Sequence, residues 1–183
     1  MKIYKRKEPH FALCGLNCCL CPRFHTNGSS KCPGCGGNEF YDKHPTCAVI
    51  TCSKKHGNIE YCFECNDFPC ERYKRIGKAD SFITYKNIIK NFESAKINFE
   101  DYMDNLKKKY KYLKLLLEKY NDGKSKALYC TAVELIPLEY IEEILNIAMN
   151  ETDNKNTKER AIKVSEKIKE KAKALNIELV LRK

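Results

Sequence analysis

The cysteines are the residues of this chain whose type and spacing indicate chemistry. Eleven of the twelve lie within residues 14–70, and three pairs have the spacing Cys-x-x-Cys: Cys18/Cys21, Cys32/Cys35 and Cys62/Cys65. Such a turn brings two sulfurs to one metal ion, and two turns supply the four thiolates of a tetrahedral zinc site. The proline and glycines around Cys32 and Cys35 favour a tight turn whose backbone amides face the sulfurs. The spacing therefore predicts metal binding.

Composition indicates a globular chain without a membrane segment. Of the 183 residues, 43% are hydrophobic and the mean hydropathy is −0.58. No apolar run approaches the roughly 20 residues that a membrane helix needs. The basic N-terminus is not followed by an apolar stretch, so we expect no signal peptide and a cytoplasmic protein. In that reducing compartment, metal–thiolate bonds are favoured over disulfides.

The formal charge of +10 raises the possibility of nucleic-acid binding. Each zinc ion held by four thiolates carries a net charge of −2, so two such sites would lower the total to about +6. The remaining lysines alternate with acidic residues, as on a solvated helix surface, and nucleic acid is not favoured as a partner. We expect Tyr61, Phe63 and Phe68 to form a small core around the metal rather than to stack on bases.

Residues after about 80 change from irregular patterning to helical periodicity. Apolar positions recur at helical spacing after Asp80 or Ser81, which are candidate caps, and again after Asn98. Further helices are expected through Leu128–Leu135, after Pro137, and after Thr157 as a cap. Residues 177–182 alternate between apolar and polar side chains and predict a closing strand.

The expected fold is therefore a small α+β protein with two regions. Residues 1–80 form an irregular, cysteine-rich metal-binding region of knuckles, and residues 81–183 form a mainly helical region with a short C-terminal strand. No spacer rich in Gly, Pro or Ser separates them, so we expect the helices to pack on the metal region as one body.

Catalytic motifs are nearly absent, and the sequence leaves open whether the protein is an enzyme. There is no phosphate-binding glycine loop and no Gly-x-Ser-x-Gly turn. Cys130 is the one cysteine outside the metal region, and its apolar neighbours favour a buried structural thiol over a nucleophile. His25 or His56 is a minor candidate to complete a metal site.

The order of the cysteines resembles the family called domain of unknown function 3795. The motifs that carry the resemblance are Cys14–Pro22, Cys32–Cys35, Cys47–Cys52 and Cys62–Cys70. Weaker similarity extends through Tyr120–Cys130 to the C-terminus, over nearly the whole chain. The resemblance implies metal binding without an established activity. It omits Cys19 and places ten other cysteines as candidate ligands: Cys14, Cys18, Cys21, Cys32, Cys35, Cys47, Cys52, Cys62, Cys65 and Cys70.

Ten ligands do not divide into tetrahedral sets. One possible arrangement uses the first two Cys-x-x-Cys pairs for one site and Cys52, Cys62 and Cys65 with Cys47 or Cys70 for another. A third site assisted by histidine, or a bridging thiolate, would use the remaining two. Both zinc and iron–sulfur clusters take thiolates, and the Cys-Pro-Gly-Cys-Gly turn with loops of mixed length favours zinc.

Three classes of function follow from these residues. We favour a structural zinc module whose helices bind a protein partner or act in regulation. A nucleic-acid-binding zinc-knuckle protein and an iron–sulfur redox or enzyme component are the alternatives. The spacing Cys14-x3-Cys18-x2-Cys21 also occurs in radical enzymes that use S-adenosylmethionine, but those need a large barrel of strands and helices that this pattern does not supply. No particular partner or oligomeric state is indicated.

Overall fold

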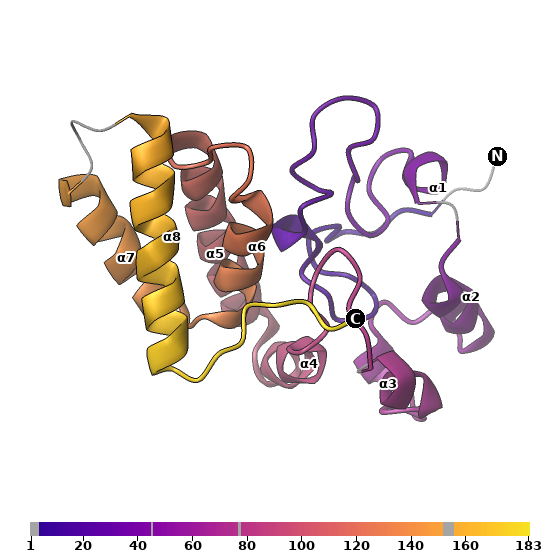
Figure 1. Cartoon of the computed structure of the whole chain (residues 1–183). Helices are drawn as coiled ribbons and strands as arrows, with labels where there is room; N and C mark the ends of the chain where they lie inside the picture. The colour runs from indigo at the N-terminus through magenta and orange to yellow at the C-terminus, as the bar shows by residue number, and fades with distance from the viewer. Residues whose placement is uncertain (1–3, 45, 77, 152–155) are drawn as a thin grey trace. The chain divides into compact units, whose positions relative to one another are not determined.

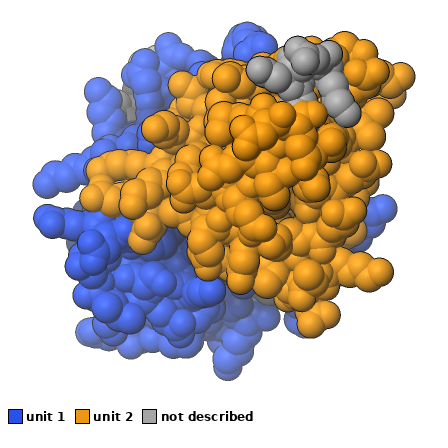
Figure 2. Space-filling view, turned by 90° about the vertical axis from the view of Figure 1, so that its left-hand side faces the viewer, with its two compact units in different colours: residues 1–102, 182–183 blue, residues 103–181 orange. Residues whose placement is uncertain are grey.

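The computed structural model describes residues 4–44, 46–76, 78–151 and 156–183, and for residues 75 and 76 only the backbone (Figure 1). The chain divides into two compact units, coloured separately in Figure 2. Unit 1 is Met1–Tyr102 with Arg182–Lys183, and unit 2 is Met103–Leu181. The expected packing of the helical region on the cysteine-rich region as one body stays a prediction, and each unit is described by itself.

Unit 1 consists of short helices joined by irregular backbone. Its helices are η1 (Cys18–Leu20), α1 (Phe40–Lys43), α2 (Ala48–Lys55), η2 (Cys62–Glu64), α3 (Glu71–Ile76) and α4 (Ile88–Ile97), with η denoting a 3₁₀ turn. Unit 1 also takes in the first residues of α5, up to Tyr102. Helices this short are not stable alone, so their positions depend on the packing and ligands around the cysteines.

An aromatic core centred on Phe92 of α4 holds unit 1 together. Phe92 is buried, and its ring lies 5.9 Å from that of Phe11, 5.2 Å from that of Phe63 and 5.3 Å from that of Phe68. Tyr61 is also buried and stacks on Phe11 at 5.1 Å. Edge-on and offset ring pairs of this kind add to the free energy gained by burial. The prediction that Tyr61, Phe63 and Phe68 form a core is confirmed.

Unit 2 is a helical bundle with an aliphatic core. It contains most of α5 (Phe99–Lys119) with α6 (Lys126–Leu135), α7 (Leu138–Glu151) and α8 (Thr157–Ala174), and α8 packs on α6 and α7 (Figure 1). The apolar faces predicted from periodicity are buried, including Leu113, Ile141 and Ile168. Cys130 is buried among them, so the prediction of a structural thiol is confirmed.

Helix starts differ in detail from the predicted caps. The final helix is capped by Asn156, whose side chain accepts from the Glu159 N–H in a capping box, rather than by Thr157. Neither Asp80 nor Ser81 caps α4, which begins later, at Ile88. Asp80 instead accepts a hydrogen bond of 2.7 Å from the backbone N–H of Tyr85. The Asp80 side chain therefore stabilises a turn before the helix rather than the N-terminus of the helix.

The predicted C-terminal strand is wrong, and with it the α+β class: the described residues hold helices and no strand. The alternation of residues 177–182 is real, because Ile177, Leu179 and Leu181 are partly buried while Glu178 and Val180 are exposed. A strand also needs a neighbouring backbone to complete a ladder of hydrogen bonds. In the described chain no second extended segment runs alongside these residues, so they form an extended tail.

The tail ends in a buried ion pair within unit 1. Asp80 has a fully buried side chain and accepts hydrogen bonds from the Arg182 guanidinium at 2.7 Å and the Arg182 backbone N–H at 2.8 Å. Burial alone would raise the pKa of Asp80, but these donors and the Tyr85 N–H outweigh it and lower the pKa to about 2. The stabilisation is present above the ordinary carboxyl pKa of 3.8 and is lost as the pH falls toward 2.

Removing this ion pair should destabilise unit 1 at neutral pH. We expect Arg182→Ala to lower the free energy of unfolding by ~2 kcal/mol, since the Asp80 carboxylate is shielded from solvent and would lose its cation. A double-mutant cycle with Asp80→Asn in urea unfolding at pH 7 measures the coupling, and the exposed neighbour Lys183→Ala is the matched control. A coupling near zero would show that Arg182 contributes nothing through Asp80.

No helix among the described residues combines the length and the apolar character that a membrane span requires.

Candidate metal centre

Two of the Cys-x-x-Cys motifs fold into the same local structure. In η1 the N–H of Cys21 donates to the Cys18 carbonyl, and in η2 the N–H of Cys65 donates to the Cys62 carbonyl, both at 3.1 Å. Cys21 and Cys65 share the same backbone angles, with φ −77° and ψ 136°. The third residue after each motif is a phenylalanine whose N–H donates back to the second cysteine. Two segments that are far apart in the sequence thus form the same turn, and each turn carries two cysteines.

Five cysteines lie in or against the apolar cluster around Leu13 and Phe40, and one of them, Cys62, also lines the small cavity described below. We call the other four thiol group A: Cys14, Cys18, Cys35 and Cys47. Burial and then the thiol of Cys35 raise the pKa of Cys14 to about 12, and the same two causes raise that of Cys18. The neutral, protonated form of these thiols is favoured, because each thiolate would lie near other thiolates in apolar surroundings. A cation bound among them would reverse this preference.

Four other cysteines surround a cavity of about 20 Å³. We call them thiol group B: Cys52, Cys62, Cys65 and Cys70. Burial raises the pKa of Cys62 to about 11, with smaller increases from the thiols of the other three. The hydroxyl of Tyr73 lies beside the Cys62 thiol, and it donates a hydrogen bond of 3.2 Å to the Cys14 carbonyl. Group B therefore places four cysteine residues around a space of atomic size.

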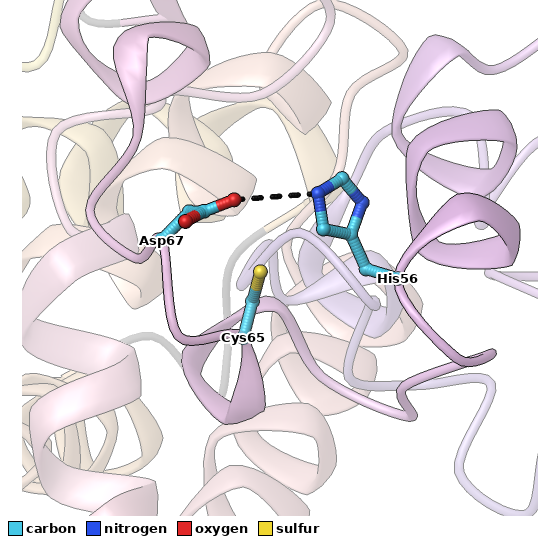
Figure 3. Close-up of side chains that lie close together, drawn as sticks. All are labelled: His56, Cys65 and Asp67. Carbon is cyan, nitrogen blue, oxygen red and sulfur yellow. Dashed lines mark ion pairs between the residues drawn. The ribbon is translucent and has the colours of Figure 1, made fainter.

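His56 and Asp67 lie beside Cys65 of group B (Figure 3). The ligand atoms of His56, Cys65 and Asp67 lie within 4.8 Å of one another, a group that could hold a metal ion. The imidazole Nε2 is 3.3 Å from the Asp67 carboxylate, while Nδ1 is 2.9 Å from the Cys52 carbonyl and 3.7 Å from its sulfur. His56 and Asp67 are exposed, so the three form an outer layer beside the cysteines. That His56 completes a site stays a prediction.

Cys21 and Cys32 form a separate pair. Their thiols interact with each other, and both line a different and larger cavity together with Cys18. Burial raises the pKa of Cys21, while the backbone N–H groups of Arg23 and Phe24 lower it. Backbone N–H groups directed at sulfur are the donors that stabilise a thiolate. The ten candidate ligands thus fall into three adjoining sets, because Cys18 also interacts with Cys32 and Cys62 also packs against the cluster of group A.

The turn that carries Cys35 depends on glycine. Gly34 has φ +82° and Gly36 has φ +74°, and a Cβ at Gly34 would come within 2.4 Å of the Pro9 carbonyl oxygen. The N–H of Cys35 donates to that same carbonyl at 2.9 Å. Only glycine permits this close approach and the left-handed backbone together. The glycines noted in the sequence therefore place Cys35 against the segment before Cys14.

Side chains from distant parts of unit 1 fix the segment between Cys14 and Cys18. Asn91 of α4 donates 3.0 Å to the Gly15 carbonyl, and Tyr102 of α5 donates 2.7 Å to the side chain of Asn17. Both partners are buried, so these hydrogen bonds satisfy groups that water does not reach. These contacts were not predictable from the sequence, because polar residues on helices are mostly exposed to solvent.

Arg6 is the functional residue that sequence reasoning missed, since residues 1–9 read as a polar lead-in. Its side chain is 1% exposed and donates to the carbonyls of Phe11 at 2.6 Å and Glu60 at 2.9 Å. It also pairs with the Glu60 carboxylate and lies 4.6 Å over the Tyr61 ring. The guanidinium lowers the pKa of Cys35, against the larger effect of burial. A buried arginine thus joins group A to the segment that precedes Cys62.

Other candidates are engaged elsewhere. The Nε2 atom of His25 is 2.7 Å from the Cys19 carbonyl oxygen, so that nitrogen has a backbone partner. Cys19 is buried and lies outside groups A and B, in keeping with its omission from the ligand set.

Comparison with known proteins agrees with the pattern of cysteines. Residues 10–75 match the family Protein of unknown function (DUF3795). The resemblance recognised from the cysteine series is confirmed over this segment, which contains all ten candidate ligands. The extension of the resemblance to the later helices stays a prediction. Searches of curated proteins and of solved structures gave no match. The DUF3795 segment is therefore a cysteine-rich module with a group of residues that could hold a metal.

Proposed function

We propose that the DUF3795 segment is a structural zinc module with two closed sites. Group A and group B each supply four thiolates, which is the number a tetrahedral zinc ion takes in structural sites. Metal binding stays a prediction for all ten cysteines, and Cys21 and Cys32 lie outside the two proposed sites. Soft thiolate donors fit zinc or an iron–sulfur cluster better than magnesium or calcium, which take oxygen.

The cavity inside group B is the observation that carries the proposal. Its volume of about 20 Å³ slightly exceeds the ~10–15 Å³ that one water-sized probe occupies, so it suits a single ion rather than an organic ligand. Four sulfurs line it from η2, α2 and the segment before α3. Without a cation, burial and mutual repulsion favour the protonated thiols, and a bound zinc ion supplies the charge that makes four adjacent thiolates stable.

A closed shell of four thiolates gives the ion a structural rather than a catalytic role. No ligand position is left for water or substrate, so neither Lewis-acid catalysis nor water activation is expected at these sites. We propose that the module organises a surface for a protein partner in a reducing compartment such as the cytoplasm. Its aromatic side chains are used in the core, which supports a protein rather than a nucleic-acid partner.

Metal content tests the proposal directly. We expect protein purified without oxygen to contain about two zinc ions per chain and to be colourless. Cys62→Ser should lose about one ion, because it removes the central thiol of group B. The matched control is Cys130→Ser, a buried cysteine of unit 2 outside both groups.

Three results would contradict the proposal in different ways. A brown sample absorbing near 400 nm would indicate an iron–sulfur cluster, and metal-free folded protein would exclude a structural metal. Equal metal content in Cys62→Ser and Cys130→Ser would remove group B as a site.

A further inference from the structure

The larger cavity of unit 1 differs in size from the cavity in group B, and the candidate ligands Cys18, Cys21 and Cys32 form one wall of it. Its volume is about 300 Å³, at the lower end of the ~300–1,000 Å³ typical of pockets that hold small organic molecules. Apolar side chains line one part of it, including Leu16 and Ile83, and Ile83 is 5% exposed. A space of this size with a firm apolar wall can hold a ring-sized ligand, which the cavity in group B cannot.

The charged side chains around this cavity are all basic. Arg23, Lys43 and His44 line it, and among the described lining residues there is no carboxylate. Lys43 pairs with Glu39 at 3.0 Å, one turn earlier on the surface. No described carboxylate forms an ion pair with Arg23, whose guanidinium lies 5.0 Å from the centre of the Phe82 ring. An accessible guanidinium with an open fork of donors is the preferred partner of a carboxylate or phosphate.

Two aromatic side chains accompany the basic ones. Phe82 is 59% exposed, the most exposed aromatic among the large hydrophobic side chains of the described chain, and it borders the cavity with Tyr85. Elsewhere in unit 1, rings such as Phe11 and Phe92 are fully buried in the core. A phenylalanine left in solvent beside a cavity gains free energy when a flat apolar group covers it.

We propose that this cavity binds a small aromatic anion. The acidic group meets Arg23 and Lys43, and the ring lies against Phe82 and Tyr85. A carboxylate and a phosphate share this chemistry, so the anionic group defines the class and its identity is an outcome of the test. Ligand binding here is a function beyond the structural role of the metal, and it requires unit 1 to be folded.

Titration calorimetry on the full, metal-loaded chain tests the proposal with four probes. Benzoate and phenyl phosphate carry both a ring and a charge, benzamide carries the ring alone, and acetate the charge alone. We expect at least one of the two aromatic anions to bind about tenfold more tightly than both benzamide and acetate, because ion pairing and ring contact act together. If neither aromatic anion exceeds benzamide and acetate, the proposal is wrong.

Variants locate the binding in this cavity. Arg23→Ala and Phe82→Ala should each weaken binding of the preferred anion about tenfold or more. The matched controls are Lys54→Ala on α2 and Ile89→Ala on α4, which are exposed and lie outside the cavity lining; they should bind as the unchanged protein does. Equal affinity in Arg23→Ala and Lys54→Ala would overturn the proposal.

Metal analysis of the same samples separates this proposal from the structural zinc proposal. Arg23 and Lys43 could instead offset the negative charge of thiolates at the wall, in which case Arg23→Ala would lose metal and the unchanged protein would bind no aromatic anion. That pair of results would overturn the cavity proposal and leave the zinc proposal standing. Anion binding by folded protein that contains no metal would overturn the zinc proposal and leave the cavity proposal standing.

Discussion

Removal of the metal under reducing conditions should unfold residues 10–75. The apolar cluster that supports group A is small, since its buried members are Ala12, Leu13, Cys35, Phe40 and Ile50. This cluster and the aromatic core around Phe92 do not offset the conformational entropy of the loops and short helices in residues 10–75, so metal binding supplies much of the folding free energy. Amide dispersion in NMR spectra of a sample treated with a chelator and a thiol reductant measures the loss.

Unit 2 provides the internal control for this experiment. Its helices bury a continuous aliphatic core that contains none of the candidate ligands, so we expect α6–α8 to keep their amide dispersion and their helical circular dichroism. A second control omits the chelator and adds only the reductant, which separates metal loss from disulfide reduction. If metal analysis shows an empty protein while the resonances of residues 10–75 stay dispersed, the metal is not structural.

Replacing Arg6 should be the most destabilising single change outside the cysteines. Arg6→Ala removes a buried cation and leaves the Phe11 and Glu60 carbonyls without their donors. It also leaves the Glu60 carboxylate without its partner. Each acceptor left without its donor costs about 1–3 kcal/mol, well above the ~0.5 kcal/mol of a surface substitution. Urea unfolding of the metal-loaded protein, followed by near-ultraviolet circular dichroism of the tyrosines, measures the difference.

Its neighbours on the chain make sharp controls for Arg6. Lys5→Ala and Lys7→Ala remove the same charge from exposed positions one residue away and should change stability little. Arg6→Lys should recover only part of the loss, since an ammonium cannot reach two carbonyls and a carboxylate with the fixed geometry of a guanidinium. A stability for Arg6→Ala equal to that of Lys7→Ala would show that the buried contacts contribute nothing.

Cysteine spacing indicated which residues are candidate metal ligands, but it did not predict how those residues are grouped in space. A Cys-x-x-Cys pair is a local signal, because the turn and its hydrogen bonds need only the residues between the sulfurs, and η1 and η2 have that form. The assignment of thiols to groups is not local. Cys14 and Cys47 join Cys18 and Cys35 through packing, whereas spacing alone favoured joining Cys21 and Cys32 to them.

The helices were predictable because, like the Cys-x-x-Cys turns, they depend on residues within one segment. The presence of a strand was not predictable in this way. Periodicity located the helices after residue 88, since each apolar face follows from spacing within its own segment. The alternation of residues 177–182 correctly indicated a half-buried extended segment. Whether such a segment becomes a strand depends on a second backbone beside it, which its own residues do not specify.

The sequence by itself determined that this chain has a cysteine-rich segment of a kind that suggests a metal, which family that segment resembles, and which later segments are helical. Each of these rests on residue types at short, fixed spacing. Tertiary structure alone decided that Arg6 is buried beside Cys35, that Asn91 and Tyr102 hold the loop between Cys14 and Cys18, and that basic and aromatic side chains meet at one cavity. Those contacts join residues far apart in the chain, and packing in three dimensions rather than spacing selects them.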